Sequence, residues 1–286
     1  MNITAAQVNE LRQKTGAGMM DCKKALVEAE GDLTKAIEIL RKKGAAVAAK
    51  RAERSANEGI VATLLSEDKS YGTIIEVNCE TDFVAKSDDF VAFTNESLKS
   101  AFDLGADSVE DLLSKNSSLN DRLLEITGKV GEKTEIKRIR RVVSDGGFVT
   151  SYIHPGSKLG CIVRFDSVPA DKASDFYQTA FDITLQVAAM KPVSVSRDEV
   201  DPELVKKELE IYKEQLMNEG KSEQIAERAA TGRLDKFFKE NCLLEQEFFK
   251  DNTKQVRDLI SEYNKNNSSG VKLHSFARFH LADENK

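Results

Sequence analysis

The chain has 286 residues, enough for two or three folding units, and its 42 basic and 48 acidic residues give a net charge of −6. Both signs of charge are spread along the chain, so the basic excess typical of nucleic-acid binders is absent and a protein partner is favoured. No run approaches the ~20 apolar residues of a membrane span, and the N-terminus lacks the basic and hydrophobic regions of a signal peptide, so we expect a cytoplasmic protein without membrane contact.

The beginning of the chain predicts a three-helix domain. Thr4 followed by Gln7 is a capping-box pattern that begins the first helix, and the glycines of residues 16–18 end it. The second helix covers about residues 19–29, and Asp32 is placed to cap the third helix.

The third helix is expected to end at Gly44, because glycine is a common C-terminal stop. Residues 45–56 are rich in Ala, Lys and Arg and have little apolar periodicity, which predicts a helical or semi-ordered linker. The N-terminal domain with its linker is therefore placed at residues 1–56.

A first core subdomain is predicted at residues 57–146, where the pattern changes to strands. Apolar runs at 60–65 and 71–79 flank a polar turn, which is typical of a β-hairpin. After the hairpin we expect one helix from Phe83 to Phe102, shorter helices at 109–113 and 119–127, and a strand at 136–142.

Residues 147–286 repeat this order and predict a second core subdomain. The expected elements are strands at 148–153 and 159–165, a helix at 172–190, a later helix from Thr253 to Tyr263, and a final strand at 271–281. The predicted fold class is therefore α+β, with a duplicated core built on small antiparallel sheets.

A helical hairpin is predicted as an insertion at about residues 197–236. Apolar residues recur there at 4-3-4 spacing, and Gly220 breaks the run. This spacing is typical of a coiled coil, which either packs within the chain or self-associates. The seam residues are Val205, Leu209, Tyr212 and Leu216.

The stretch Thr81-Asp82-Phe83-Val84 lies where the second predicted strand meets the following helix. Thr81 or Asp82 can accept a hydrogen bond from the free N–H groups of that helix, which would leave Phe83 as a rigid, exposed hydrophobic side chain beside a carboxylate. Composition alone favours the alternative, in which Phe83 enters the core with Phe90 and Phe93, because most aromatic side chains are buried.

The Gly16–Gly18 segment is followed by two lysines but lacks the spacing of a phosphate-binding loop, and no strand precedes it. A nucleotide site is therefore disfavoured. The segment instead places Met19 and Met20 either on a contact surface or in the core, and the sequence favours neither over the other.

A basic cluster in the last strand of the first core subdomain alternates with apolar residues. This favours the solvent face of a strand over a phosphate-binding surface, and no direct contact with nucleic acid is expected. The cluster consists of Lys133, Lys137, Arg138, Arg140 and Arg141.

The four cysteines lie far apart and form no Cys-x-x-Cys pair, which predicts reduced thiols rather than disulfides or a zinc site. Cys79 or Cys161 could pair with His154, but no third orienting group or oxyanion motif accompanies them. His154 precedes Pro155 and is expected in a surface turn. We expect no catalytic residue, cofactor or metal.

The segments Leu11–Leu26 and Glu76–Lys86 together resemble the bacterial elongation factor Ts family. Further segments agree in the family's order and extend the resemblance over nearly the whole chain. They are Gly146–Gly160, Lys191-Pro192, Gly220-Lys221, Gly232-Arg233 and Lys236-Phe237.

The resemblance implies a guanine nucleotide exchange factor, not an enzyme, which releases GDP from elongation factor Tu. It implies that Thr81, Asp82, Phe83 and Val84 displace magnesium from the partner GTPase. It further implies that the partner is contacted by Arg12, Met19, Met20 and His154.

The resemblance also implies a ubiquitin-associated-like N-terminal domain and a protruding coiled coil that mediates homodimerisation in some members. Two other functions stay open on the residues alone. One is a general protein-binding adaptor that uses the three-helix domain, and the other is a thiol enzyme with a depressed cysteine pKa.

Overall fold

The computed structural model describes residues 3–283. Its N-terminal part consists of helices α1 (Ala5–Thr15), α2 (Met19–Glu28) and α3 (Leu33–Arg51). The predicted caps are confirmed: the Thr4 hydroxyl accepts the Gln7 N–H at 3.3 Å, and the Asp32 carboxylate accepts two N–H groups at the start of α3. The three helices enclose a small core around Leu11 and Leu26.

The prediction that the third helix ends at Gly44 is wrong, because α3 continues to Arg51. Gly44 is buried against helix α7 (Ser118–Val130), and an added Cβ would lie 2.6 Å from the carbonyl oxygen of Leu124. Gly128 lies opposite on α7. The glycine therefore permits a close approach of two helices, and most of the expected linker is helical.

The first sheet contains strands β1 (Glu58–Leu65), β2 (Tyr71–Cys79) and β3 (Thr134–Val143) in that order, all antiparallel. Four helices lie between β2 and β3 in the chain and pack on one face of the sheet. They are α4 (Asp82–Ala85), α5 (Asp88–Leu104), α6 (Val109–Lys115) and α7.

The single helix predicted from Phe83 to Phe102 is wrong, since two helices occupy this segment. The Ser87 hydroxyl donates to the Val84 carbonyl at 2.7 Å and accepts the Phe90 N–H at 3.4 Å. Ser87 therefore ends the first helix and caps the second. The break makes α4 a separate single turn.

The second sheet contains β4 (Phe148–Ile153), β5 (Leu159–Asp166) and β8 (Lys272–His280), also antiparallel and in that order. Helices α8 (Ala173–Met190) and α11 (Val256–Asn267) contribute to the core on one face. The helix predicted from Thr253 begins later, because Asp251–Gln255 is strand β7, which pairs with β6 (Glu247–Phe248).

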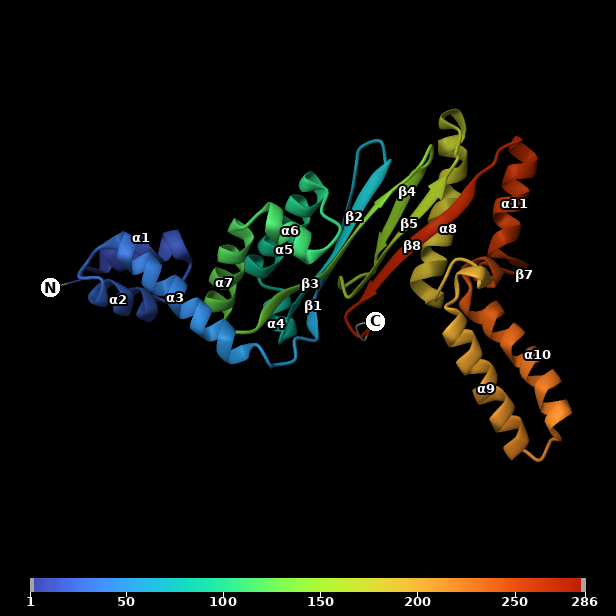
Figure 1. The fold of residues 1–286 in the computed structure, drawn as a ribbon. Coiled ribbons are helices and arrows are strands. Elements are labelled where there is room, and N and C mark those ends of the chain that lie inside the picture. The colour runs from blue at the N-terminus through green and yellow to red at the C-terminus, as the bar shows by residue number, and fades with distance from the viewer. Residues whose placement is uncertain (1–2, 284–286) are drawn as a thin grey trace.

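The two three-stranded sheets pack against each other through a shared apolar layer. This layer includes Val61 and Ile74 from the first sheet and Val149, Ile162 and Phe279 from the second. Figure 1 shows the two sheets side by side with helices on their outer faces. The structure is thus α+β with small antiparallel sheets, and each sheet follows the order hairpin, helices, third strand.

Helices α9 (Pro202–Asn218) and α10 (Glu223–Asn241) form an antiparallel hairpin that projects from the second sheet's end of the molecule (Figure 1). Leu216 is buried against Ala226 and Ala230, and Leu209 and Tyr212 pack beside them. Within the described residues, no helix combines the length and apolar character that a membrane span requires.

Candidate partner-binding site

Phe83 is 84% exposed, the highest value among the exposed large hydrophobic residues of the described part. The alternative that Phe83 joins the core is wrong, although Phe90 and Phe93 are buried as that alternative supposed. The single turn of α4 turns Ala85 and Val84 toward the core, which leaves Phe83 on the outer side. Aromatic residues are enriched at protein–protein interfaces, which makes Phe83 a candidate contact residue.

Thr81 fixes the backbone beneath Phe83 through three groups. Its hydroxyl accepts the Val84 N–H at 3.3 Å as the N-cap of α4, and its carbonyl accepts the Cys79 thiol at 3.1 Å. Its N–H and hydroxyl donate to the two carboxylate oxygens of Glu132, at 3.0 and 2.8 Å. The backbone of the corner is therefore held even though Phe83 itself has few neighbours.

Asp82 does not cap the helix but forms an ion pair with Lys86 at 2.7 Å. The hydrogen bond from the Lys86 ammonium lowers the pKa of Asp82. The corner therefore presents an ionised carboxylate beside the exposed ring at neutral pH.

A surface depression of about 500 Å³ joins this corner to the N-terminal helices. Phe83, Thr81 and Val84 line it together with Arg12 and with Gly16–Gly18, the segment between α1 and α2. The N-terminal helices and the Phe83 corner, which are remote in the chain, thus form one surface. The resemblance implies that Arg12 and the corner both contact the partner.

Met19 and Met20 are exposed at the start of α2, by 56% and 63%. The alternative in which they fill the core is wrong, because Cys22, Ala25 and Leu26 supply the buried face of this helix. Adaptable apolar side chains therefore lie on the surface next to the Gly16–Gly18 segment.

His154 is exposed at the end of β4, where Tyr152 and the ring nitrogen Nδ1 of His154 lie 3.0 Å apart. Its turn packs against the start of β1: the Val61 N–H donates to Ser157, and Lys158 pairs with Glu58 at 2.6 Å. Because Glu58 pairs with Cys79 in the first sheet, His154 lies at the same end of the sheets as the Phe83 corner, although it does not line the depression.

All four cysteines are free and buried. Burial, reinforced by the charge of Glu132, raises the pKa of Cys79 to about 12, and burial raises that of Cys161 to about 12 as well. Thiols with raised pKa values are poor nucleophiles, which argues against the thiol enzyme. In the described residues no group of three or more His, Cys, Asp and Glu side chains is arranged to hold a metal.

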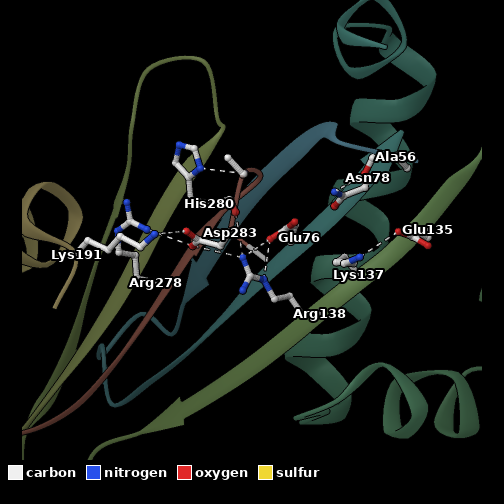
Figure 2. A network of polar contacts seen from close by, with 11 residues as sticks. Ala56, Glu76, Asn78, Glu135, Lys137, Arg138, Lys191, Arg278, His280 and Asp283 are labelled. Carbon is white, nitrogen blue, oxygen red and sulfur yellow. Dashed lines mark hydrogen bonds and ion pairs between the residues drawn. The ribbon is translucent and has the colours of Figure 1, made fainter. Parts of the chain in front are cut away.

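The basic cluster differs from the prediction at Arg138, which lies between the two sheets. A bulge between Glu76 and Val77 shifts the register of β3, and Arg138 pairs with the buried Glu76 at 2.7 Å (Figure 2). Its guanidinium also lies over the Phe279 ring. The remaining cluster members contact Glu135, Asp107 or the Tyr71 ring. These partners leave no array of unpaired cations for phosphate.

Sequence reasoning missed Glu132 and Glu80, the two carboxylates that brace the corner. The Glu80 carboxylate accepts the Lys133 N–H at 2.6 Å and pairs with Arg51 and Arg54 at 2.6 and 3.1 Å. Glu80, the residue before Thr81, is thereby tied to the end of α3 and to the segment before β3. No local pattern identifies either carboxylate, because both act on residues far along the chain.

A family model described as Elongation factor TS matches residues 80–283. The elongation factor Ts of Chlorobaculum tepidum is 46% identical over 286 residues, which cover 98% of each chain. That of Prosthecochloris aestuarii is also 46% identical with 98% of each chain covered, and that of Clostridium botulinum strain Eklund 17B is 44% identical, with 97% of this chain and 92% of its own covered. The chain therefore belongs to the elongation factor Ts family.

Proposed function

We propose that the chain is the guanine nucleotide exchange factor of elongation factor Tu in translation elongation. It binds the GDP-loaded GTPase, disturbs the magnesium and nucleotide site, and promotes GDP release so that GTP can bind. The observation that carries the proposal is an 84% exposed Phe83 on a backbone that Thr81 holds through hydrogen bonds. This activity makes and breaks no covalent bond and needs no cofactor of its own.

Phe83 acts as a wedge between helices of the GTPase. Burial of an aromatic side chain removes ~150–250 Å² from water and is worth a few kcal/mol, which becomes available only when the partner's helices move apart. That movement displaces the magnesium ion. Linkage makes the effect reciprocal: the factor by which this protein weakens GDP binding equals the factor by which GDP weakens its own binding.

Asp82 acts beside the wedge, where its ionised carboxylate repels or hydrogen-bonds the groups around the displaced metal. Thr81 and Val84 hold the shape of the corner, Thr81 as the helix cap and Val84 by packing on the core. The four residues Thr81–Val84 thus form one magnesium-displacing unit.

Two further contacts brace the wedge. Arg12, Met19 and Met20 on a ubiquitin-associated-like domain of residues 1–56 grip the GTPase on one side. His154, on the second core subdomain of residues 147–286, binds a distal part of the same partner. The wedge itself belongs to the first core subdomain, residues 57–146. The shared depression between Arg12 and Phe83 supports a continuous interface.

The hairpin insertion at about residues 197–236 forms a coiled coil that mediates a homodimer. Met217 and Ile225, 46% and 57% exposed near its turn, supply apolar surface for a second copy. Sedimentation of the wild type and of Ile225→Glu tests this role. A monomeric wild type contradicts it.

The exchange function is tested by stopped-flow release of a fluorescent GDP analogue from elongation factor Tu, with rising amounts of this protein. A saturable acceleration of release supports the proposal. Binding without acceleration supports the adaptor function instead, and the two outcomes are separated by measuring complex formation on the same samples.

A further inference from the structure

Glu132, in the short segment between α7 and β3, uses both carboxylate oxygens on a single residue of the Phe83 corner. One oxygen accepts the Thr81 N–H at 3.0 Å and the other accepts the Thr81 hydroxyl at 2.8 Å. Thr81 and Glu132 are 51 positions apart in the chain, so this pair of hydrogen bonds, the Glu132 bracket, closes a long loop that contains α4 to α7. Hydrogen bonds to a charged acceptor are stronger than neutral ones.

The bracket determines which way the Thr81 hydroxyl points. Because that hydroxyl donates its hydrogen to Glu132, its lone pairs are free to accept the Val84 N–H. Helix α4 has only four residues, too few for its own hydrogen bonds to hold it as a stable helix. The cap on Val84 therefore depends on Glu132, and the direction of Phe83 depends on the cap.

Glu132 is itself held in place by its neighbours. The adjacent Lys133 N–H donates to Glu80, which also binds Arg51 and Arg54. Glu132 and the preceding Val130 line the same depression as Phe83 and Arg12. The carboxylate thus sits at the edge of the proposed interface, on a backbone that is fixed from behind.

We propose that Glu132 is a positioning residue for nucleotide exchange, which acts by holding Thr81 so that Phe83 is presented in one direction. This inference rests on the proposed function, because Phe83 must be the group that acts on the partner. A backbone already fixed in its binding conformation loses less entropy when Phe83 inserts, so more of the burial energy of the ring is available to move the partner's helices.

The positioning itself is tested without the partner. The chain contains no tryptophan, so Phe83→Trp introduces a single tryptophan at the corner, whose fluorescence can be excited selectively over that of the tyrosines. We expect Glu132→Gln in this background to lower the fluorescence anisotropy and to raise the acrylamide quenching rate. Glu135→Gln is the matched control, a half-buried glutamate at the start of β3 whose ion pairs within residues 3–283 are with Lys133 and Lys137. Unchanged anisotropy in Glu132→Gln overturns the inference.

The consequence for exchange is tested by a double-mutant cycle on stimulated GDP release. We expect Glu132→Gln to reduce stimulation roughly tenfold in the wild type, a loss typical of a charge-assisted pair, and to cause no further loss in Phe83→Ala. Equal losses in both backgrounds would show a structural role and overturn the inference. Thermal unfolding identifies any variant that is not folded at the assay temperature.

Two results separate this inference from the proposed function. If the wild type does not accelerate GDP release, the proposed function fails, whereas the anisotropy still decides whether Glu132 orders the corner. If the wild type accelerates release and Glu132→Gln is as active as Glu135→Gln, the function stands and the role of Glu132 fails. Thr81→Val, which removes the hydroxyl that Glu132 accepts, should lower stimulation to the level of Glu132→Gln.

Discussion

The corners that follow β2 and β5 hold equivalent places in the two sheets, yet they treat their apolar residues in opposite ways. After β2 the chain exposes Phe83, whereas after β5 it buries Val168, which is 5% exposed, in the core of the second sheet. Both corners carry a carboxylate network. The same order of elements thus exposes an aromatic residue at one corner and buries an aliphatic residue at the other.

The carboxylate networks at the two corners differ in where their partners come from. At the second corner the Asp166 carboxylate accepts hydrogen bonds from the Arg164 guanidinium and the Asp145 N–H, which fix the end of β5. The next residue, Ser167, has a positive φ of 56°. At the first corner Glu132 and Glu80 reach in from other elements and support a separate helical turn. The proposed exchange function therefore rests on local side-chain chemistry at one corner rather than on the repeated element order.

The largest effect is expected from Phe83→Ala, which should abolish most stimulation of GDP release, a loss of more than roughly tenfold given the burial energy of an aromatic side chain. Its unfolding midpoint should match the wild type, because the ring is 84% exposed. Stopped-flow release and thermal unfolding on the same preparation check both halves. Undiminished stimulation would refute the wedge.

Val168→Ala should show the reverse pattern. Truncation of this buried side chain should lower the free energy of unfolding by about 2 kcal/mol through lost burial and the cavity left behind. Stimulation of GDP release should stay at the wild-type level below the unfolding transition. Urea unfolding measures the loss, and a specific exchange defect in the folded variant would break the distinction between the corners.

Glu80→Gln should change how stability depends on pH. Burial alone would raise the pKa of Glu80, but the Lys133 N–H and the guanidinium groups of Arg51 and Arg54 lower it from 4.5 to about 2. A depressed folded-state pKa contributes stability above pH 4.5 that is lost as the pH falls toward 2.

We expect this contribution to be about 1 kcal/mol, because the exposed Arg54 pairing is screened by solvent. Urea unfolding between pH 6 and pH 3 should therefore show a shallower acid decline for Glu80→Gln than for the wild type. Parallel curves for the two proteins would contradict the assigned role.

The smallest effect is expected from Asp82→Asn. The Asp82–Lys86 pair is exposed and screened by solvent, so its removal should leave the free energy of unfolding nearly unchanged. Stimulated release should fall only a few-fold and should become less sensitive to salt, since the charge beside the wedge is lost. A loss as large as that of Phe83→Ala would instead assign the main role to the carboxylate.

Much of the fold was accessible from local patterns. The caps at Thr4 and Asp32 and the hairpin before Cys79 depend on residues close together in the chain, and all three predictions are confirmed. The Thr81–Val84 corner was located by the same reasoning, because a strand pattern gives way there to a helix pattern. Gly44 was misread, since its buried contact with Leu124 is invisible to any local pattern.

The sequence by itself determined where most of the elements lie, the family and the position of the stretch Thr81–Val84, because hydrogen-bonding caps, periodicity and motifs are properties of neighbouring residues. Only the tertiary structure decided that Phe83 faces solvent, that Glu132 brackets Thr81, and that Arg138 lies between the sheets. The physical reason is that exposure and electrostatic pairing depend on groups brought together across the fold, and the same residue type can be buried, paired or exposed according to what packs against it.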